Sequence, residues 1–135
     1  GLWGEWVMDW LSEPLHLTSH WAEWFDADLV WASPTLTAIS LVEYVIFAPV
    51  FEELAFRGLL FAILRRRFRF LPAALISASI FAIAHGYGLV GFLSVLWSGL
   101  LWAWMYEKTG SLLPGMLAHA INNLLVCLAV MALLR

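Results

Sequence analysis

Residues 35–69 of the chain read TLTAISLVEYVIFAPVFEELAFRGLLFAILRRRFR. Positions 35–64 are mostly apolar, and four arginines within the next five positions end the apolar stretch. A stretch of about 30 apolar residues is long enough to cross a bilayer as a tilted or kinked helix. Pro49 lies where we expect the kink. The stretch therefore predicts a membrane-spanning helix, and it carries charged residues of a kind that such helices rarely contain.

The composition of the whole chain agrees with lipid as its solvent. Of its 135 residues, 63% are hydrophobic and 13% are charged, and the mean hydropathy is +0.85. A water-soluble domain carries about a quarter charged residues, so this chain has too few polar side chains to cover a soluble surface. The same balance excludes a disordered chain and a nucleic-acid-binding protein. The one cysteine, Cys127, excludes an internal disulfide.

Three further apolar segments follow the first, so we predict an all-α, polytopic membrane helix bundle with about four transmembrane helices. The second segment begins near Pro72 and ends at His85, where a Gly-Tyr-Gly sequence interrupts it. The third covers 89–106, and the fourth begins after Ser111, which we expect to cap it. Positions 34–135 contain no repeat or linker that would divide them, so we treat them as one transmembrane core.

Positions 1–33 differ from this core in composition. They hold six of the nine tryptophans and six of the ten acidic residues, and no Lys or Arg. Trp3, Trp6, Val7 and Trp10 share one face of a predicted helix, and acidic side chains take the opposite face. Because indole rings favour the membrane–water interface, we predict an amphipathic interfacial leader. A surface helix that binds a partner is the alternative.

The positive charges predict the orientation in the membrane. Arg65, Arg66, Arg67, Arg69 and Lys108 fall in the two loops on one side of the predicted bundle. Cytoplasmic loops are enriched in Lys and Arg, so we expect these loops to be cytoplasmic, in a bacterial inner (plasma) membrane. The acidic leader then lies on the opposite face, which requires something upstream to have carried it across the membrane. Further N-terminal membrane helices are the simplest explanation.

Polar side chains inside the apolar segments mark the candidate site, because an ionisable group in lipid costs several kcal/mol unless it is paired or lies in a cavity. The candidates are Glu52, Glu53, Arg57, His85, His119 and Asn123. At a helical rise of 1.5 Å per residue, Glu52, His85 and His119 lie about 12–20 Å from the cytoplasmic loops. In a hydrocarbon core about 30 Å thick, all three are near mid-depth and can meet in one pocket.

Helical spacing divides these residues into pairs. Glu53 and Arg57 are four positions apart, so they share a helix face and are expected to form an ion pair. That pairing leaves Glu52 as an unpaired carboxylate, which burial pushes toward the protonated form and which suits a group that takes and gives protons. His119 and Asn123 share a face for the same reason.

Three motifs in a fixed order connect these residues with a known family. EExxxRG lies at 52–58, FxxxH at 81–85 and HxxxN at 119–123, each on a separate predicted helix. In this order they resemble the motifs of the CPBP family, the CAAX proteases and bacteriocin-processing enzymes also called the Abi family. The resemblance extends over about 35–134. Members of this family carry several further membrane helices before the first motif, where this chain has only the leader.

The resemblance implies an intramembrane endopeptidase of the glutamic type. The position of Glu52 matches the group that activates a water, helped by the group that His85 matches. His119 and Asn123 match the pair that holds the oxyanion, and we expect Glu53 with its arginine partner to support the site. Amide hydrolysis needs a base for water, a proton donor for the leaving amine and donors that face the oxyanion, so these residue types suit the reaction.

Two alternatives to this interpretation stay open. Glu52, His85 and His119 have the ligand types of a catalytic zinc. We favour a site without a metal or other cofactor, because Asn123 is a poor zinc ligand and the HExxH motif is absent. The second alternative is a non-catalytic membrane scaffold of the same fold, such as a bacteriocin-immunity protein.

The expected partners are membrane lipid and a peptide or protein substrate. Within the family the substrate is a CAAX-type C terminus, a leader peptide or a sorting tail, and the sequence does not distinguish among these. It does not specify the oligomeric state either.

Overall fold

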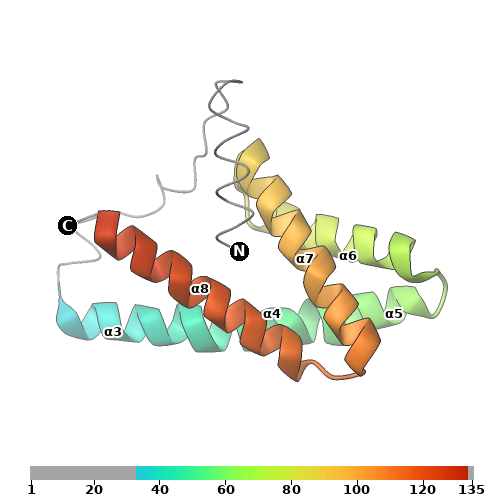
Figure 1. Ribbon diagram of the computed structural model, residues 1–135, viewed down its shortest axis with the longest axis horizontal. Helices are drawn as coiled ribbons and strands as arrows, with labels where there is room; N and C mark the ends of the chain where they lie inside the picture. Colours follow the sequence, from blue (N-terminus) through green and yellow to red (C-terminus); the bar gives the residue numbers. More distant parts are fainter. Residues whose placement is uncertain (1–32, 134–135) are drawn as a thin grey trace.

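The computed structural model describes residues 33–133, and within them the backbone is helical with no strand (Figure 1). The predicted all-α class is confirmed. The predicted interfacial leader lies outside the described residues. Four helical units follow one another along the described chain. The first is a continuous helix composed of α3 (Pro34–Val42), η3 (Glu43–Phe47), α4 (Ala48–Glu53), η4 (Leu54–Phe61) and α5 (Ala62–Arg65). The other three are α6 (Phe70–Ala84), α7 (Leu89–Thr109) and α8 (Leu113–Leu133).

Three of these units are long and apolar enough to cross a membrane: Pro34–Arg65, Leu89–Thr109 and Leu113–Ala132. The fourth, α6, is apolar but has 15 residues. At 1.5 Å per residue it extends about 22 Å, which is shorter than a hydrocarbon core about 30 Å thick. The four predicted apolar segments are therefore present, in an integral membrane protein whose second helix is short.

The first helix does not break at Pro49. The residue lies inside α4, with the π-helical segments η3 and η4 on either side. Proline has no amide hydrogen, and its ring crowds the carbonyl four residues earlier in an α-helix. In η3 the amide of Ala48 donates instead to the carbonyl of Glu43, five residues back, which gives a wider turn. The helix thus continues through Pro49 with a change of hydrogen-bond register next to the carboxylate pair.

Small residues let the helices pack closely around the first one. In Figure 1, α6 and α7 lie side by side against the end of the first helix that includes α5. Alanines of α6 and α7 pack on a buried phenylalanine of η4, and small residues at helix–helix contacts allow this approach in membrane proteins. The core consists of Phe61, Ala73, Ala74 and Ala103.

The outer surface is apolar, as a lipid-facing surface must be. Phe51, Ile83 and Trp97 are 66%, 68% and 62% exposed, and large aliphatic side chains cover much of the remaining outer face. Exposed apolar surface of this extent marks a contact with a membrane or with another protein.

The turn between α7 and α8 sets the position of the last helix. Gly110 ends α7 with a φ of +64°, a conformation that favours glycine. The hydroxyl of Ser111 then accepts a hydrogen bond of 3.2 Å from the amide of Leu113, the first residue of α8. The carbonyl of Leu112 accepts from the amide of Met116, so Ser111 lies one residue before the cap position that we predicted for it. From this turn α7 and α8 diverge, and α8 crosses η3 and α4 (Figure 1).

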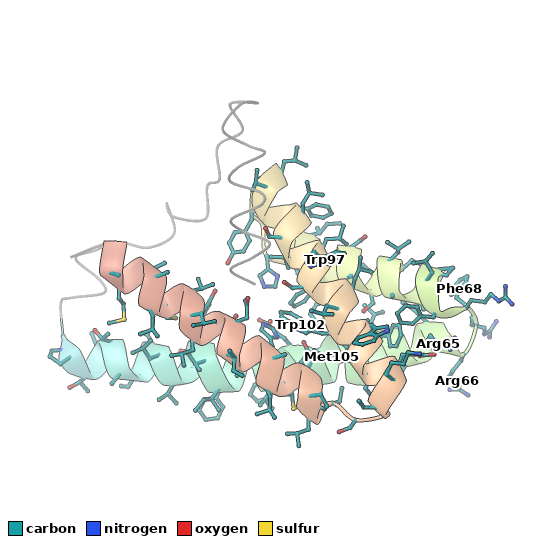
Figure 2. The ribbon with its side chains drawn as sticks, viewed as in Figure 1. Arg65, Arg66, Phe68, Trp97, Trp102 and Met105 are labelled. Atoms are coloured by element: carbon teal, nitrogen blue, oxygen red, sulfur yellow. The ribbon has the colours of Figure 1, made fainter. Side chains whose placement is uncertain are left out.

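The arginine-rich end of the bundle is fixed by an ion pair between distant helices. Arg65 donates two hydrogen bonds to Glu107 on α7, Nε to Oε2 at 2.9 Å and Nη2 to Oε1 at 2.6 Å. Its remaining Nη1 donates to the carbonyl of Phe68 at 2.8 Å. Figure 2 shows Arg65, Arg66 and Phe68 at this end of the molecule.

Candidate active site

The two adjacent carboxylates at the end of α4 lie in different environments. The side chain of Glu53 is 1% exposed, whereas that of Glu52 is 31% exposed. Successive residues of a helix point in directions about 100° apart, so one side chain enters the core while the other remains at its edge. Glu52 is thus accessible to a second molecule, and Glu53 is not.

The buried carboxylate forms the ion pair that its spacing predicts. Arg57 Nη1 donates to Glu53 Oε1 at 2.9 Å, and Arg57 Nη2 donates to the carbonyl of Gly99 at 3.1 Å. The guanidinium carbon lies 4.5 Å from the ring centroid of Phe81 and 5.2 Å from that of Trp102. Three helices therefore hold this buried cation, and two aromatic faces take the place of water around it.

His119 lies between the two carboxylates. Its Nδ1 is 3.1 Å from Glu53 Oε1, and its Nε2 is 3.4 Å from Glu52 Oε2. A carboxylate oxygen accepts hydrogen bonds, so Nδ1 donates to Glu53 and Nε2 is the nitrogen that faces the other carboxylate. The indole of Trp102 stacks on the imidazole, with ring centroids 3.9 Å apart and an interplanar angle of 17°. These contacts fix both the position and the plane of the ring.

His85 lies at the C-terminal cap of α6 and is half-buried. Its Nδ1 is 2.8 Å from the carbonyl of Phe81, so Nδ1 donates to this carbonyl and Nε2 is the ring nitrogen that remains for other contacts. Among the hydrogen bonds and ion pairs of the described residues, none joins His85 to Glu52 or to His119. The ring of Phe81 contacts both imidazoles edge to face, with centroid distances of 4.5 Å to His85 and 6.0 Å to His119.

Asn123 is buried one turn beyond His119 on α8. Its Nδ2 donates a hydrogen bond of 2.9 Å to the backbone carbonyl of Tyr44 in η3. The amide group therefore links α8 to the first helix, upstream of the carboxylate pair. A primary amide has two N–H bonds, so a second donor remains.

The structure joins four of the six predicted residues, Glu52, Glu53, Arg57 and His119, in one connected network. It places Asn123 one turn beyond His119, bonded to a backbone carbonyl, and leaves His85 at the edge of the network. Phe81, the first residue of the FxxxH motif, is 1% exposed and contacts Phe56 edge to face at 4.9 Å. It also contacts both imidazoles and the guanidinium. Phe81 is therefore the packing centre of the site.

Trp102 is the site residue that sequence reasoning missed. Two other tryptophans of α7, Trp97 and Trp104, are exposed. Trp102, which Figure 2 labels, is 5% exposed, and its indole stacks on His119 of α8. The available signal was its spacing of three residues from Gly99, which puts the two residues on one face of α7. A glycine beside a large ring on that face indicates a position where another helix can pack closely.

Three buried polar atoms of the site have no hydrogen-bond partner among the described residues: Glu52 Oε2, Glu53 Oε2 and Arg57 Nε. Glycine makes room next to one of them, since a Cβ at Gly115 would lie 3.1 Å from Glu53 Oε2. Buried polar atoms without a partner are rare and occur at sites of chemistry or of bound water.

The described residues contain no group of three or more His, Cys, Asp and Glu side chains placed to hold a metal ion. The zinc ligands considered from the sequence, Glu52, His85 and His119, are therefore not arranged as a ligand set. Both ring nitrogens of His119 face carboxylates, and Nδ1 of His85 is bonded to the backbone carbonyl of Phe81.

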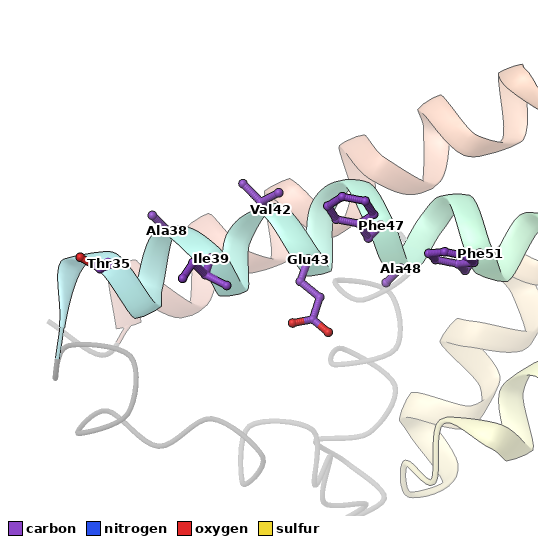
Figure 3. Close-up of a pocket in the computed structure, with 8 residues that line it drawn as sticks. All are labelled: Thr35, Ala38, Ile39, Val42, Glu43, Phe47, Ala48 and Phe51. Atoms are coloured by element: carbon purple, nitrogen blue, oxygen red, sulfur yellow. The ribbon is translucent and has the colours of Figure 1, made fainter.

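An open groove of about 710 Å³ lies elsewhere, on the outer face of the first helix (Figure 3). It does not include the carboxylate pair. Its lining is apolar except for a threonine and a glutamate: Thr35, Ala38, Ile39, Val42, Glu43, Phe47, Ala48 and Phe51.

Comparisons with known proteins bear on the same segment. A family model described as type II CAAX prenyl endopeptidase Rce1-like matches residues 34–125, which include all three motifs. The chain is 30% identical over 99 residues to the protein named "Putative membrane peptidase YdiL" of Bacillus subtilis (strain 168). That match covers 73% of this chain and 38% of the length of the relative. No solved structure matches the chain.

Proposed function

The chain belongs to the type II CAAX prenyl endopeptidase Rce1-like family, and from this premise we propose that it is an intramembrane endopeptidase of the glutamic type. Its substrate is a membrane-associated protein or peptide, cut at a CAAX-type C terminus, a leader peptide or a sorting tail. It acts in a bacterial inner membrane, with the arginine-rich loop and the loop at Lys108 in the cytoplasm. The observation that carries the proposal is the contact of 3.4 Å between Glu52 and His119 at the edge of a buried ionic network.

In the proposed reaction Glu52 is the general base. It takes a proton from a water molecule, whose oxygen forms a bond to the carbonyl carbon of the scissile amide. The half-exposed position of Glu52 allows substrate and water to reach it, while the buried carboxylate next to it does not compete for them. The proton then passes from Glu52 to the amide nitrogen as the C–N bond breaks, which regenerates the carboxylate.

The other polar residues have supporting roles in this proposal. His85 orients the water through its Nε2, because its Nδ1 is engaged with a backbone carbonyl. His119, when Nε2 carries a proton, and Asn123, through its second N–H, donate to the oxyanion of the tetrahedral intermediate. Losing one donor of this kind costs about 100- to 1,000-fold in rate. Glu53 and Arg57 position His119 and do not contact the substrate.

Comparative peptidomics tests the proposal. The peptides are compared among cells that make the wild-type chain, the Glu52→Gln variant or the Glu43→Gln variant. The matched control, Glu43, is an exposed glutamate of the same helix outside the ionic network. We expect a set of cleaved peptides with the wild type and Glu43→Gln that is missing with Glu52→Gln, and these peptides identify the substrate and the cut site. Identical peptide sets in all three strains would support a non-catalytic scaffold instead.

A second assay distinguishes a zinc-dependent protease from the proposed mechanism without a metal. Purified protein is treated with a chelator and then supplied with zinc. We expect cleavage to continue in the chelator; loss of cleavage that zinc restores would assign a metalloprotease.

A further inference from the structure

Pro49 creates a defect in the hydrogen bonds of the first helix. The amide of Ala48 donates to the carbonyl of Glu43, five residues earlier. In this register the next carbonyl, that of Tyr44, would accept from the amide of residue 49. Residue 49 is proline and has no N–H to donate. The backbone therefore offers the Tyr44 carbonyl no donor in this register, and an unpaired buried carbonyl is unfavourable.

A side chain from another helix supplies the missing donor. Asn123 Nδ2 lies 2.9 Å from the Tyr44 carbonyl oxygen, and the asparagine is 8% exposed. The two residues are 79 positions apart in the sequence, so this hydrogen bond fixes α8 against η3. It gives the Tyr44 carbonyl the donor that Pro49 lacks.

The second π-helical segment has a similar contact. In η4 the carbonyl of Phe56 accepts a hydrogen bond of 3.0 Å from the hydroxyl of Ser77 on α6, and Ser77 is 1% exposed. The carboxylate pair thus lies between two π-helical segments, each of which has a backbone carbonyl that receives a buried side-chain donor from a different helix.

We propose that Asn123 is a positioning residue: its amide donates to the carbonyl that Pro49 leaves without a backbone partner, and so holds α8 in register with the carboxylate pair. Tyr44 precedes Glu52 on the same continuous helix, and Asn123 follows His119 by one turn of α8. The hydrogen bond is therefore a second connection between the two helices that bring Glu52 and His119 within 3.4 Å. This role uses one N–H of the amide and does not depend on the proposed chemistry.

Hydrogen exchange of the purified chain in detergent tests this role without a substrate. We expect Asn123→Ala to speed amide exchange in residues 43–53 by about tenfold, which corresponds to losing one buried hydrogen bond. The neighbouring Asn122→Ala is the matched control and is expected to exchange like the wild type. Ser77→Ala is expected to speed exchange in residues 54–61 and to leave 43–53 unchanged.

Restoring a backbone N–H at position 49 distinguishes the loss of one hydrogen bond from a general destabilisation of α8. Pro49→Ala returns an N–H to position 49, so in Pro49→Ala/Asn123→Ala we expect the exchange of residues 43–53 to return toward the wild-type rate. The proposal is overturned if Asn123→Ala leaves that segment unchanged, or if it speeds exchange equally in every helix and the double variant does not recover.

Cleavage of the substrate in the same variants gives an independent readout that rests on the proposed function. We expect the double variant to regain part of the activity that Asn123→Ala loses, since the oxyanion donor is still missing but the helices are again in register. If the exchange rates recover and no variant cleaves any peptide, the proposed function fails and the positioning role stands. If activity stays at the Asn123→Ala level after the exchange has recovered, the amide does not act on catalysis through helix register.

Discussion

A single carboxylate oxygen organises the site at the scale of residues. Glu53 Oε1 accepts from Arg57 at 2.9 Å and from His119 at 3.1 Å. Because the guanidinium balances its charge, the buried carboxylate can orient an imidazole without remaining an isolated ion. The sequence predicted the ion pair from its spacing. It did not predict the contact with His119, because 66 residues separate the two side chains.

Arg57→Ala is expected to destabilise the protein by about 3–5 kcal/mol, because it leaves the carboxylate of Glu53 buried without its cation. Thermal unfolding in detergent micelles measures the loss. Arg66→Ala, which removes an exposed arginine of the same helical region, is the control and should leave the melting temperature unchanged. Equal melting temperatures for the two variants would mean that the buried pair does not stabilise the fold.

Trp102→Leu is expected to lower kcat by about two- to tenfold with little change in KM, because an aromatic stack contributes about 0.5–1.5 kcal/mol beyond its buried area. The substitution keeps an apolar side chain but frees the plane of His119. Trp104→Leu, an exposed position of the same helix, is the matched control. If both variants reduce kcat equally, the stacked ring has no specific part in catalysis.

At the scale of elements, the sequence predicts which residues share a helix face better than it predicts the hydrogen-bond register of a helix. The spacing of four residues correctly places Glu53 with Arg57, whereas the predicted cap at Ser111 was one residue too early. The π-helical turns around Pro49 were not predictable, because the prediction assumed that proline kinks the helix. Their register depends on contacts from other helices, such as the hydroxyl of Ser77 on the Phe56 carbonyl.

Gly99 shows how tightly α7 packs against the ion pair. A Cβ at this position would lie 3.0 Å from Arg57 Nη2 and 3.0 Å from the Cβ of Ala78. We expect Gly99→Ala to destabilise the protein by about 1–3 kcal/mol through overpacking. At Gly58 the nearest atom is the end of the Leu112 side chain, at 3.2 Å, which can move aside.

Gly58→Ala is therefore the matched substitution and is expected to be close to neutral, since the better helix propensity of alanine offsets the contact. Thermal unfolding of both variants in the same detergent measures the difference. Equal destabilisation of the two would show that Gly99 is not a close-packing position.

At the scale of the whole molecule, hydropathy predicts the four apolar segments and motif order predicts the family. The contacts that join the segments were beyond the sequence, because they connect distant positions that no local pattern relates. Arg65 illustrates the limit: the sequence identifies it as an orientation signal, and the structure adds the ion pair with Glu107 that ties α5 to α7.

The orientation itself is tested by labelling a single cysteine. In a Cys127→Ser background, Lys108→Cys is expected to react with a membrane-impermeant maleimide only after the cells are permeabilised, because positively charged loops stay in the cytoplasm. Labelling of intact cells would place this loop on the outer face and invert the proposed topology.

The central claim is that Glu52 is the base that activates water at this site. The most direct test is the single-turnover cleavage rate of purified Glu52→Gln in lipid vesicles, on the substrate that peptidomics identifies, compared with the wild type and Glu43→Gln. We predict a rate about 100- to 10,000-fold below the wild type for Glu52→Gln, with equal helicity by circular dichroism and no loss for Glu43→Gln. A Glu52→Gln enzyme that cleaves at the wild-type rate would contradict the assignment.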